Sequence, residues 1–407
     1  MRKVYLDNSA TTQTDPAVAE LMMKYMVEDY GNPSSVHGFG RPVRKAVEDA
    51  REQVRVAIGA SHVGEITFTS GGTEAANMAL RGVAYANKQK GNHIITTAVE
   101  HHCVLTTCEM LAKEGFEVTV LPVDEYGLVS VEDVANALTD KTILVSIMHA
   151  NNEVGTIMPI AEIGQMLRKQ GRKIIFHTDA VQSIGKIPVN VDDLNVDLLT
   201  LSGHKIYGPK GIGAMYLRRG TWWQPIMYGG GQERRRRPGT ENAPAIIGLG
   251  KAIEMAVANQ PEYYERLTKL HKKVVDRVLN SIPNTRSNGH PEKRIPGHAS
   301  FCIEYVEGES MLLSLDMKGI AISSGSACTS GSLEPSHVLL AMGIPVEIAH
   351  GSLRISMGKH TTEEDVDYFV DSLIPIVERL RQMSPLAAGG FDPNCTPGGS
   401  CSSCGRK

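Results

Sequence analysis

The stretch LLTLSGHKIYGPKGIG, at residues 198–213, indicates both a fold class and the position of a site. The apolar run LLTL predicts a buried strand, and the turn at 202–205 is followed by glycines at 208, 211 and 213. Lys205 is therefore expected at the end of a strand, in tightly folded backbone. A lysine in this setting is a candidate to carry pyridoxal phosphate as a Schiff base, and an ordinary loop lysine is the simpler alternative.

Short apolar runs alternate with helical patterns on the amino-terminal side of this stretch. The predicted strands cover 93–99, 116–123, 142–150, 173–180 and 197–203, and the helices between them cover 103–114, 130–138 and 160–170. This alternation predicts an α/β fold with a doubly wound, mostly parallel sheet flanked by helices. Ligands in such folds bind at the carboxyl ends of the strands.

A second turn, Ser-Gly-Gly-Thr at 70–73, joins a short predicted strand to an alanine-rich helix. Free N–H groups and the positive end of the helix dipole make this turn a candidate phosphate site, with Gly72 and Thr73 at its centre. A simple helix cap formed by Thr73 and assisted by Glu74 explains the same residues almost as well.

Polar residues follow the other predicted strands and supply the remaining parts of a pyridoxal phosphate site. Asp179 ends an apolar strand, where an unpaired carboxylate is costly, and it suits a protonated pyridine nitrogen. His101 is placed to stack on a ring, and Asn152 and Gln182 can donate to a ring hydroxyl. A structural hydrogen bond is the simpler role for each residue alone. Their joint placement with Lys205 favours the cofactor site.

Two residues in the last third of the chain are candidates for the reaction itself. Cys328 lies in SSGSACTSGS at 323–332, where small residues give the thiol no apolar surroundings, as a nucleophile serving an outside acceptor requires. Cys103, Cys108 and Cys302 are expected as buried apolar side chains. Arg354 can clamp an α-carboxylate, with a structural ion pair as the alternative.

Length and composition limit the class of protein. With 407 residues, 42% hydrophobic and 21% charged, and a formal net charge of −3, the chain is typical of a globular protein without nucleic-acid or membrane partners. The N-terminus has no apolar leader pattern, and no apolar run spans a bilayer, so we expect a cytoplasmic protein. The glycine motifs of P-loop nucleotide hydrolases and of dinucleotide-binding folds are incomplete in this sequence, so neither class is supported.

We expect three parts in the chain. Residues 16–257 form a large cofactor-binding domain, and residues 1–15 and 258–383 form a smaller α+β domain that carries the cysteine loop. Residues 384–407 form a flexible tail rich in Gly, Ser and Pro. Its cysteines, Cys395, Cys401 and Cys404, make an incomplete zinc pattern. They are either employed in redox, sulfur-relay or metal chemistry, or have no chemical role.

The chain resembles the pyridoxal-phosphate-dependent cysteine desulfurases of the NifS/IscS type, within the class V aminotransferase-like enzymes of fold type I. The motifs that carry this resemblance are YLDNSATT at 5–12, TSGGTEAAN at 69–77, EHH at 100–102, NNEVG at 151–155, HTDAVQSIGK at 177–186, SGHKIYGPKG at 202–211, RPGTEN at 237–242, SSGSACTSGSLEPSHVL at 323–339 and GSLRISMGK at 351–359. The C-terminal cysteines depart from the family pattern.

The resemblance implies a role for each matching residue. Lys205 would carry the cofactor, with His101 on the ring, Asp179 at its nitrogen, and Asn152 and Gln182 at its hydroxyl. Gly72, Thr73, Ser202 and His204 would hold the phosphate, together with Thr240 from the other subunit of a homodimer. Arg354, with Asn152, would bind the substrate. Cys328 would accept the sulfur and serve as a transient iron–sulfur ligand with a scaffold partner.

The implied activity converts L-cysteine to L-alanine and leaves the sulfur on Cys328 as a persulfide for acceptors in iron–sulfur cluster assembly. Two alternatives remain open. The first, in the same fold, is a selenocysteine lyase or another class V lyase or transaminase. The second is a sulfur or metal carrier that acts through the C-terminal cysteines.

Overall fold

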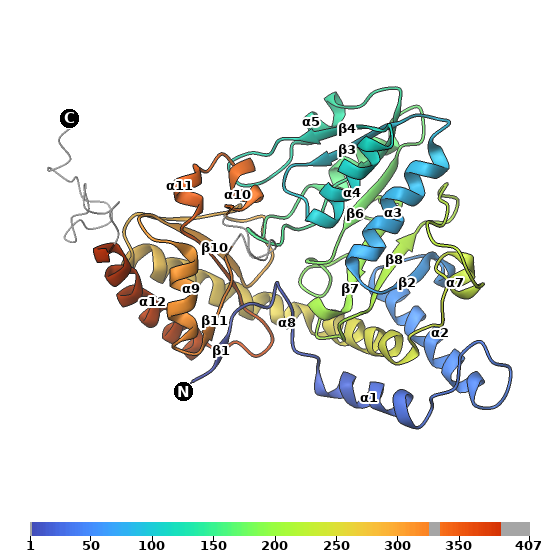
Figure 1. Cartoon of the computed structure of the whole chain (residues 1–407), viewed down its shortest axis with the longest axis horizontal. Coiled ribbons are helices and arrows are strands. Elements are labelled where there is room, and N and C mark those ends of the chain that lie inside the picture. The colour runs from blue at the N-terminus through green and yellow to red at the C-terminus, as the bar shows by residue number, and fades with distance from the viewer. Residues whose placement is uncertain (1, 325–333, 384–407) are drawn as a thin grey trace.

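The computed structural model describes residues 2–324 and 334–383 (Figure 1). The predictions for Cys328 and for Cys395, Cys401 and Cys404 lie outside these residues.

A seven-stranded sheet forms the larger part of the molecule, and its strand order is β2-β8-β7-β6-β5-β3-β4. The strands are β2 (Ile66–Thr69), β3 (His93–Thr97), β4 (Glu117–Leu121), β5 (Thr142–Ser146), β6 (Ile175–Asp179), β7 (Leu198–Ser202) and β8 (Gly213–Leu217). Only β8 runs antiparallel to its neighbours, β2 and β7. The predicted, mostly parallel sheet is confirmed, with shorter strands than expected.

Helices cover both faces of this sheet (Figure 1). One face packs against α3 (Gly72–Asn87) and α4 (His102–Lys113), and the other packs against α1 (Pro16–Val27), α2 (Gly40–Ala57), α5 (Val131–Asn136), α6 (Ile160–Arg168) and the first part of α8. Leu198 and Leu199 of β7 enter opposite cores, as the period of two in a strand requires. Burial on both faces explains why these strands are continuous apolar runs.

The helix α8 (Ala243–Ser281) is 39 residues long and corrects one prediction. The sequence pattern predicts two helices here, at 245–257 and about 261–281. Pro261 instead lies inside one continuous helix, on an exposed position, where the lost backbone bond does not leave a buried group unpaired. The buried residues of α8 continue on both sides of it, from Ile253 to Leu267.

Two small sheets lie beside the second half of α8. The strands β9 (Thr285–Ser287), β10 (His298–Ile303) and β12 (Ser352–Ser356) form an antiparallel sheet, and β1 (Val4–Tyr5) pairs in parallel with β11 (Ile320–Ala321). They pack with α9 (Gly308–Asp316) and α12 (Glu363–Met383) around a second core. The order of elements from β10 onward matches the predicted alternation, but its three-stranded sheet is antiparallel.

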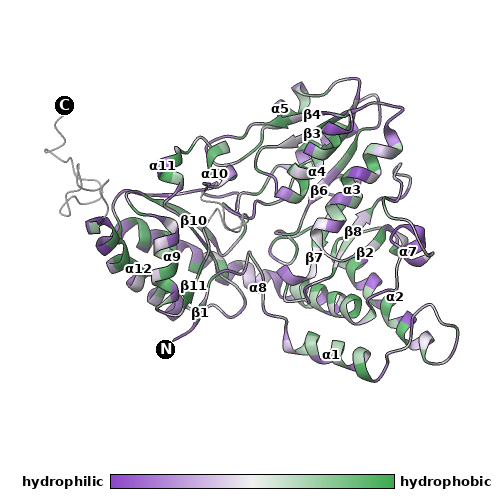
Figure 2. Ribbon diagram, in the orientation of Figure 1, coloured by the Kyte–Doolittle hydropathy of each residue, from purple (hydrophilic) through white to green (hydrophobic). Residues whose placement is uncertain are grey.

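The remaining helices are short: α7 (Gln232–Arg235), α10 (His337–Ala341) and α11 (Val346–Ala349), with single turns at Val63–Glu65 and Gly203–Lys205. In Figure 2 the helices around the large sheet show green and purple regions side by side, as amphipathic helices do. The predicted domain division after residue 257 falls inside α8. In addition, Val338 and Leu339 of α10 pack in the first core.

Candidate active site

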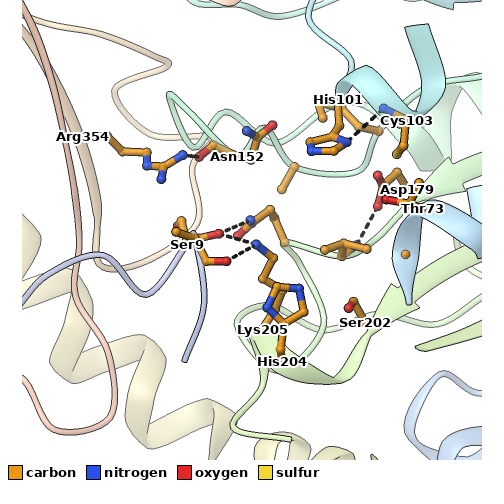
Figure 3. A pocket seen from close by; sticks show the side chains of 16 residues that line it. Ser9, Thr73, His101, Cys103, Asn152, Asp179, Ser202, His204, Lys205 and Arg354 are labelled. Atoms are coloured by element: carbon orange, nitrogen blue, oxygen red, sulfur yellow. Dashed lines mark hydrogen bonds between the residues drawn. The ribbon is translucent and has the colours of Figure 1, made fainter. Parts of the chain in front are cut away.

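One pocket collects the polar residues that follow β3, β5, β6 and β7 (Figure 3). It is lined by Ser9, Ala10, Gly72, Thr73, His101, Cys103, Met148, Ala150, Asn152, Asp179, Val181, Gln182, Ser202, His204, Lys205 and Arg354. The structure therefore brings together all the predicted cofactor- and substrate-binding residues except Thr240. In Figure 3, His101 and Lys205 face each other across the pocket, with Asp179 and Arg354 at its two ends.

Lys205 follows β7 after a single helical turn, Gly203–Lys205. Glycine is needed at 203 because a Cβ there would lie 2.9 Å from Ile212 Cγ2 and 3.0 Å from the oxygen of Pro209. The Nζ atom of Lys205 donates to the main-chain oxygens of Ser9 and Ala10, at 2.6 and 2.7 Å. The N-terminal segment thus meets the lysine across the pocket.

Asp179 ends β6 and is buried. Its Oδ1 accepts a hydrogen bond from the N–H of Val181 at 2.9 Å. Burial raises the pKa of its carboxyl, and the hydrogen bonds and the charge of Lys205 oppose that rise. No Lys, Arg or His nitrogen forms an ion pair with Asp179 in the described part of the chain. The site therefore suits a cationic group that enters from outside.

His101 begins α4 as its N-cap residue. Its Nδ1 accepts from the N–H of Cys103 at 3.1 Å, so the proton of the neutral ring lies on Nε2. Burial, followed by the charge of Lys205, lowers the pKa of His101 to about 4. His101 is thus a neutral, flat ring at neutral pH, which is suited to stacking.

The N-terminus of α3 opens into the same pocket. Its N-cap, Gly71, provides no side-chain cap, and a Cβ on Gly72 would lie 3.0 Å from Val181 Cγ2. Glu74 does assist the turn, because it accepts from the N–H of Ser70 at 2.6 Å. The pocket side of this helix end is left with N–H groups and the Thr73 hydroxyl, as an anion requires.

His204 lies on the Lys205 turn and shares a hydrogen bond with Thr11, from Nδ1 to Oγ1, at 3.1 Å. Burial, with the charges of Lys205 and Lys210, lowers its pKa to about 4. The ring is therefore a neutral hydrogen-bonding group beside the α3 terminus, as Ser202 is.

Arg354 extends from β12 to the opposite end of the pocket. Its Nη2 donates to Asp7 Oδ1 at 3.0 Å and its Nη1 to the oxygen of Asn152 at 3.3 Å. The Nε atom is buried and has no hydrogen-bond partner in the described structure. The structural ion pair therefore coexists with one buried N–H that has no partner in the described structure.

Sequence reasoning missed several lining residues. Cys103, expected in the core, instead lines the pocket and is half-buried, whereas Cys108 and Cys302 are buried as predicted. Burial raises the pKa of the Cys103 thiol, which therefore stays protonated and is a poor nucleophile. Its position two residues after His101, in the first turn of a helix, was a signal for this placement. For Ser9 and Ala10 the local sequence had no signal for a place in the pocket wall, because the residues that contact them are distant in the chain.

Thr240 does not line the pocket. It is exposed, at the end of a loop that is tied down by Arg237, whose Nε donates to Glu74 at 2.9 Å. Earlier in the chain than Arg237, Glu233 forms a buried ion pair with Arg51.

The residues on either side of 325–333 are anchored beside the pocket. Ser323 exchanges two main-chain hydrogen bonds with Arg354. On the other side, Ser336 donates from its hydroxyl to Glu153, and His337 donates from Nε2 to the oxygen of Glu100 at 2.9 Å. Arg354 lines the pocket, so its bonds hold Ser323 next to the pocket wall.

The class V aminotransferase sequence profile matches residues 4–369. The chain belongs to the class V aminotransferase family. It is 54% identical to the "Cysteine desulfurase IscS" of Clostridium botulinum over 387 residues, which are 95% of this chain and 97% of that protein. It is 53% identical to the "Cysteine desulfurase IscS" of Methanosarcina thermophila, over 95% and 94% of the two chains. A solved "NIFS-LIKE PROTEIN" superimposes with a TM-score of 0.88 at 40% identity, over 93% of this chain and 100% of that one.

Class V aminotransferases use pyridoxal phosphate, and the residues present fit it. The uncapped N-terminus of α3 suits the phosphate, the buried Asp179 suits a protonated ring nitrogen, and the neutral His101 suits the ring. Within the described residues, no cluster of metal-binding side chains occurs and no helix has the length and apolar character that crossing a bilayer requires.

Proposed function

We propose that the chain is a cysteine desulfurase, which converts L-cysteine to L-alanine and passes the sulfur to acceptors for iron–sulfur cluster assembly. The observation that supports this most directly is the pocket in which Lys205, Asp179 and Arg354 meet, in a chain 54% identical to a protein with that name. The enzyme depends on pyridoxal phosphate.

Each lining residue has a proposed role toward the cofactor. Lys205 holds it covalently, and Asp179 keeps the ring nitrogen protonated. His101 lies against the ring. The amides of Asn152 and Gln182 face the ring hydroxyl, and Gly72, Thr73, Ser202 and His204 receive the phosphate. When bound, the cofactor withdraws electrons from the carbon that carries the substrate amino group.

The side chains of the protein orient the substrate and move its protons. Arg354, which lines the pocket, binds the α-carboxylate, with Asn152 beside it. When the substrate occupies the site, the Nζ atom of Lys205 would be the group that takes the Cα proton. Because the ring of His101 is neutral, its Nε2–H serves as a hydrogen-bond donor.

Cys328 is proposed as the sulfur acceptor. Its thiolate attacks the substrate sulfur, the bond between that sulfur and Cβ breaks, and Cβ takes up a proton. L-Cysteine and the Cys328 thiol thus give L-alanine and a Cys328 persulfide, with no external oxidant. Support comes from the anchoring of Ser323 and Ser336 at the pocket, since Cys328 lies on the segment between them. The same thiol would serve as a transient iron–sulfur ligand with a scaffold partner.

We further propose that the enzyme is a cytoplasmic homodimer in which Thr240 of one subunit reaches the cofactor phosphate of the other. The exposed position of Thr240, on a loop held by the Arg237–Glu74 ion pair, supports a contact outside its own subunit.

The test incubates the cofactor-loaded protein with L-cysteine and measures alanine, sulfide and protein persulfide. Wild type, Cys328→Ala and Lys205→Ala are compared. We expect persulfide on Cys328 in the wild type only, and loss of alanine production in both variants. Alanine production that survives Cys328→Ala would instead favour a selenocysteine lyase or another class V enzyme. Sulfur transfer unaffected by Lys205→Ala would favour a carrier acting through Cys395, Cys401 and Cys404.

A further inference from the structure

A second lysine, Lys186, lies next to the Lys205 site. It ends the turn that follows β6, and its Nζ donates to Gln182 Oε1 at 2.7 Å. Lys186 shares a cavity with Lys205, Ser9 and His298, on the side of Lys205 away from the α3 terminus. None of the roles proposed above involves it.

Hydrogen bonds connect the two lysines. Gln182 Nε2 donates to the main-chain oxygen of Ser9 at 3.0 Å, and Lys205 Nζ donates to the same oxygen at 2.6 Å. A lysine ammonium only donates and a main-chain oxygen only accepts. The Gln182 amide is therefore fixed in one orientation, with its oxygen toward Lys186 and its nitrogen toward Ser9. Gln182 also lines the pocket, and since its oxygen accepts from Lys186, the second N–H of its amide is the donor that it can offer a ligand.

Ser9 is itself held in place from several directions. Its N–H donates to Ser356 Oγ at 2.8 Å. His298 Nε2 must donate to the main-chain oxygen of Glu153, at 2.9 Å, so its Nδ1 accepts from the Ser9 hydroxyl at 3.1 Å. The Ser9 oxygen is thus a fixed acceptor between Gln182 and Lys205.

The positive charge of Lys186 has no ion-pair partner among the described residues and is only partly present at neutral pH. Burial of the amine, followed by the charges of Lys205 and Arg354, lowers the pKa of Lys186 to about 7. A lysine that is costly to bury and has only an amide as partner is a poor choice for stability alone.

We propose that Lys186 is a positioning residue for the Lys205 site: it holds the Gln182 amide with its nitrogen toward the pocket and places a second positive charge beside the Lys205 amine. The proposal rests on the proposed function in one respect, that Lys205 carries the cofactor. A cation close to a Schiff-base lysine favours the neutral form of its nitrogen.

Other titratable and charged groups lie around Lys205 and also influence the protonation of its nitrogen. Among the described residues, the groups that interact electrostatically with Lys205 or Lys186 include Asp179, His101, His204, His298 and Arg354. Tyr207, Tyr263 and Lys359 line the same cavity as the two lysines, and Lys359 is paired with Asp15. The three histidines have lowered pKa values and are neutral at neutral pH, and Asp179 and Arg354 lie at opposite ends of the pocket. Within this set, Lys186 is the cation that hydrogen bonds connect to Lys205. The connection runs through the Gln182 side chain and the main-chain oxygen of Ser9.

The test follows the visible absorption of bound pyridoxal phosphate as a function of pH in the full-length enzyme. Lys186→Met removes the charge and the donor, Lys186→Gln removes only the charge, and Lys186→Arg keeps both. We expect the titration midpoint of the Lys205-linked cofactor to rise by about one pH unit in the two neutral variants. Lys186→Arg should stay close to wild type. Lys272→Met, at an exposed position on α8, controls for the change in net charge.

If either neutral variant binds the cofactor and its titration midpoint is unchanged, the proposed effect of the Lys186 charge on Lys205 is wrong. If Lys186→Met does not bind the cofactor, Lys186→Gln is the variant that decides the test. The KM for L-cysteine, measured in parallel, should change less than kcat, because none of the proposed substrate contacts involves Lys186. If the wild type itself takes up no cofactor on Lys205, the proposed function fails as well. Loaded variants with an unchanged midpoint and normal alanine production would reject only the role of Lys186.

Discussion

The guanidinium of Arg354 and the carboxylate of Asp7 lie 3.0 Å apart, although 347 residues separate them in the sequence. Asp7 follows the first strand, β1, and Arg354 lies in the last, β12. The arginine side chain is almost entirely buried, so its charge is only partly balanced by this one carboxylate. This arrangement orients the guanidinium at the wall of the pocket, where it can meet an incoming carboxylate.

Arg354→Lys should therefore impair substrate binding specifically. A lysine cannot bind Asp7 and a substrate carboxylate through one rigid planar group. We expect KM for L-cysteine to rise by about 10- to 100-fold, which corresponds to about 1.5–3 kcal/mol for a charged hydrogen bond. The cofactor spectrum should not change. Asp7→Asn should raise KM less, because the guanidinium keeps its charge. An equal KM in wild type and Arg354→Lys would contradict this role.

Glu100 gives a prediction for stability as a function of pH. Burial raises the pKa of its carboxyl from 4.5 to about 8, so the folded protein holds a proton there that the unfolded chain releases above pH 4.5. The stability that Glu100 contributes is present below that pH and is lost as the pH rises toward 8.

Glu100→Gln should abolish this loss. Relative to wild type, the variant should gain up to about 1.4 kcal/mol of unfolding free energy per pH unit between pH 5 and 8. Urea unfolding at several pH values measures the difference. Parallel curves for the two proteins across this range would show that Glu100 is not protonated when folded.

Arg51 contacts two carboxylates that differ in burial, which offers a matched comparison. Its guanidinium binds the buried Glu233 at 2.6 and 2.7 Å and the exposed Glu48 at 3.2 Å. Glu233, Arg234 and Arg235 all have positive φ, so this strained turn depends on its contacts.

Glu233→Ala should cost about 3–5 kcal/mol, because it leaves a buried guanidinium without its main partner. Glu48→Ala should cost about 0–1 kcal/mol, as exposed ion pairs do. Thermal unfolding of the two variants provides the measurement. Equal melting temperatures would mean that the buried pair contributes no more than the exposed one.

Gly82 is predicted to be intolerant of any side chain. A Cβ there would lie 2.0 Å from Trp223 Nε1, which donates to the oxygen of Met78 at 2.7 Å. Gly82→Ala should displace the indole, break that bond and destabilise the fold by about 1–3 kcal/mol. Tryptophan fluorescence should shift to longer wavelength. Gly38→Ala, where only Arg41 approaches, at 3.9 Å, should leave both stability and fluorescence unchanged.

The sequence predicted the parts of the structure that depend on local pattern. The mostly parallel sheet and the gathering of Asp179, His101 and Lys205 followed from apolar runs and from what ends them. The single helix α8 was not predicted, because an exposed Pro261 has the same sequence signature whether or not a helix continues through it. Ser9 was missed because β1 is only two residues long, and its pairing with β11 has no local signal.

The pairing of the first residues with the last strands also determines when the enzyme can be completed during its synthesis. Val4 pairs with Ile320, and Asp7 bridges Ser356. The seven strands of the large sheet are all translated by residue 217, so that sheet can form early. Ser9 and Ala10 contact Lys205 directly, but the bond from the Ser9 N–H to Ser356 can form only after β12 has left the ribosome. The N-terminal wall of the pocket is therefore completed only when translation is nearly finished.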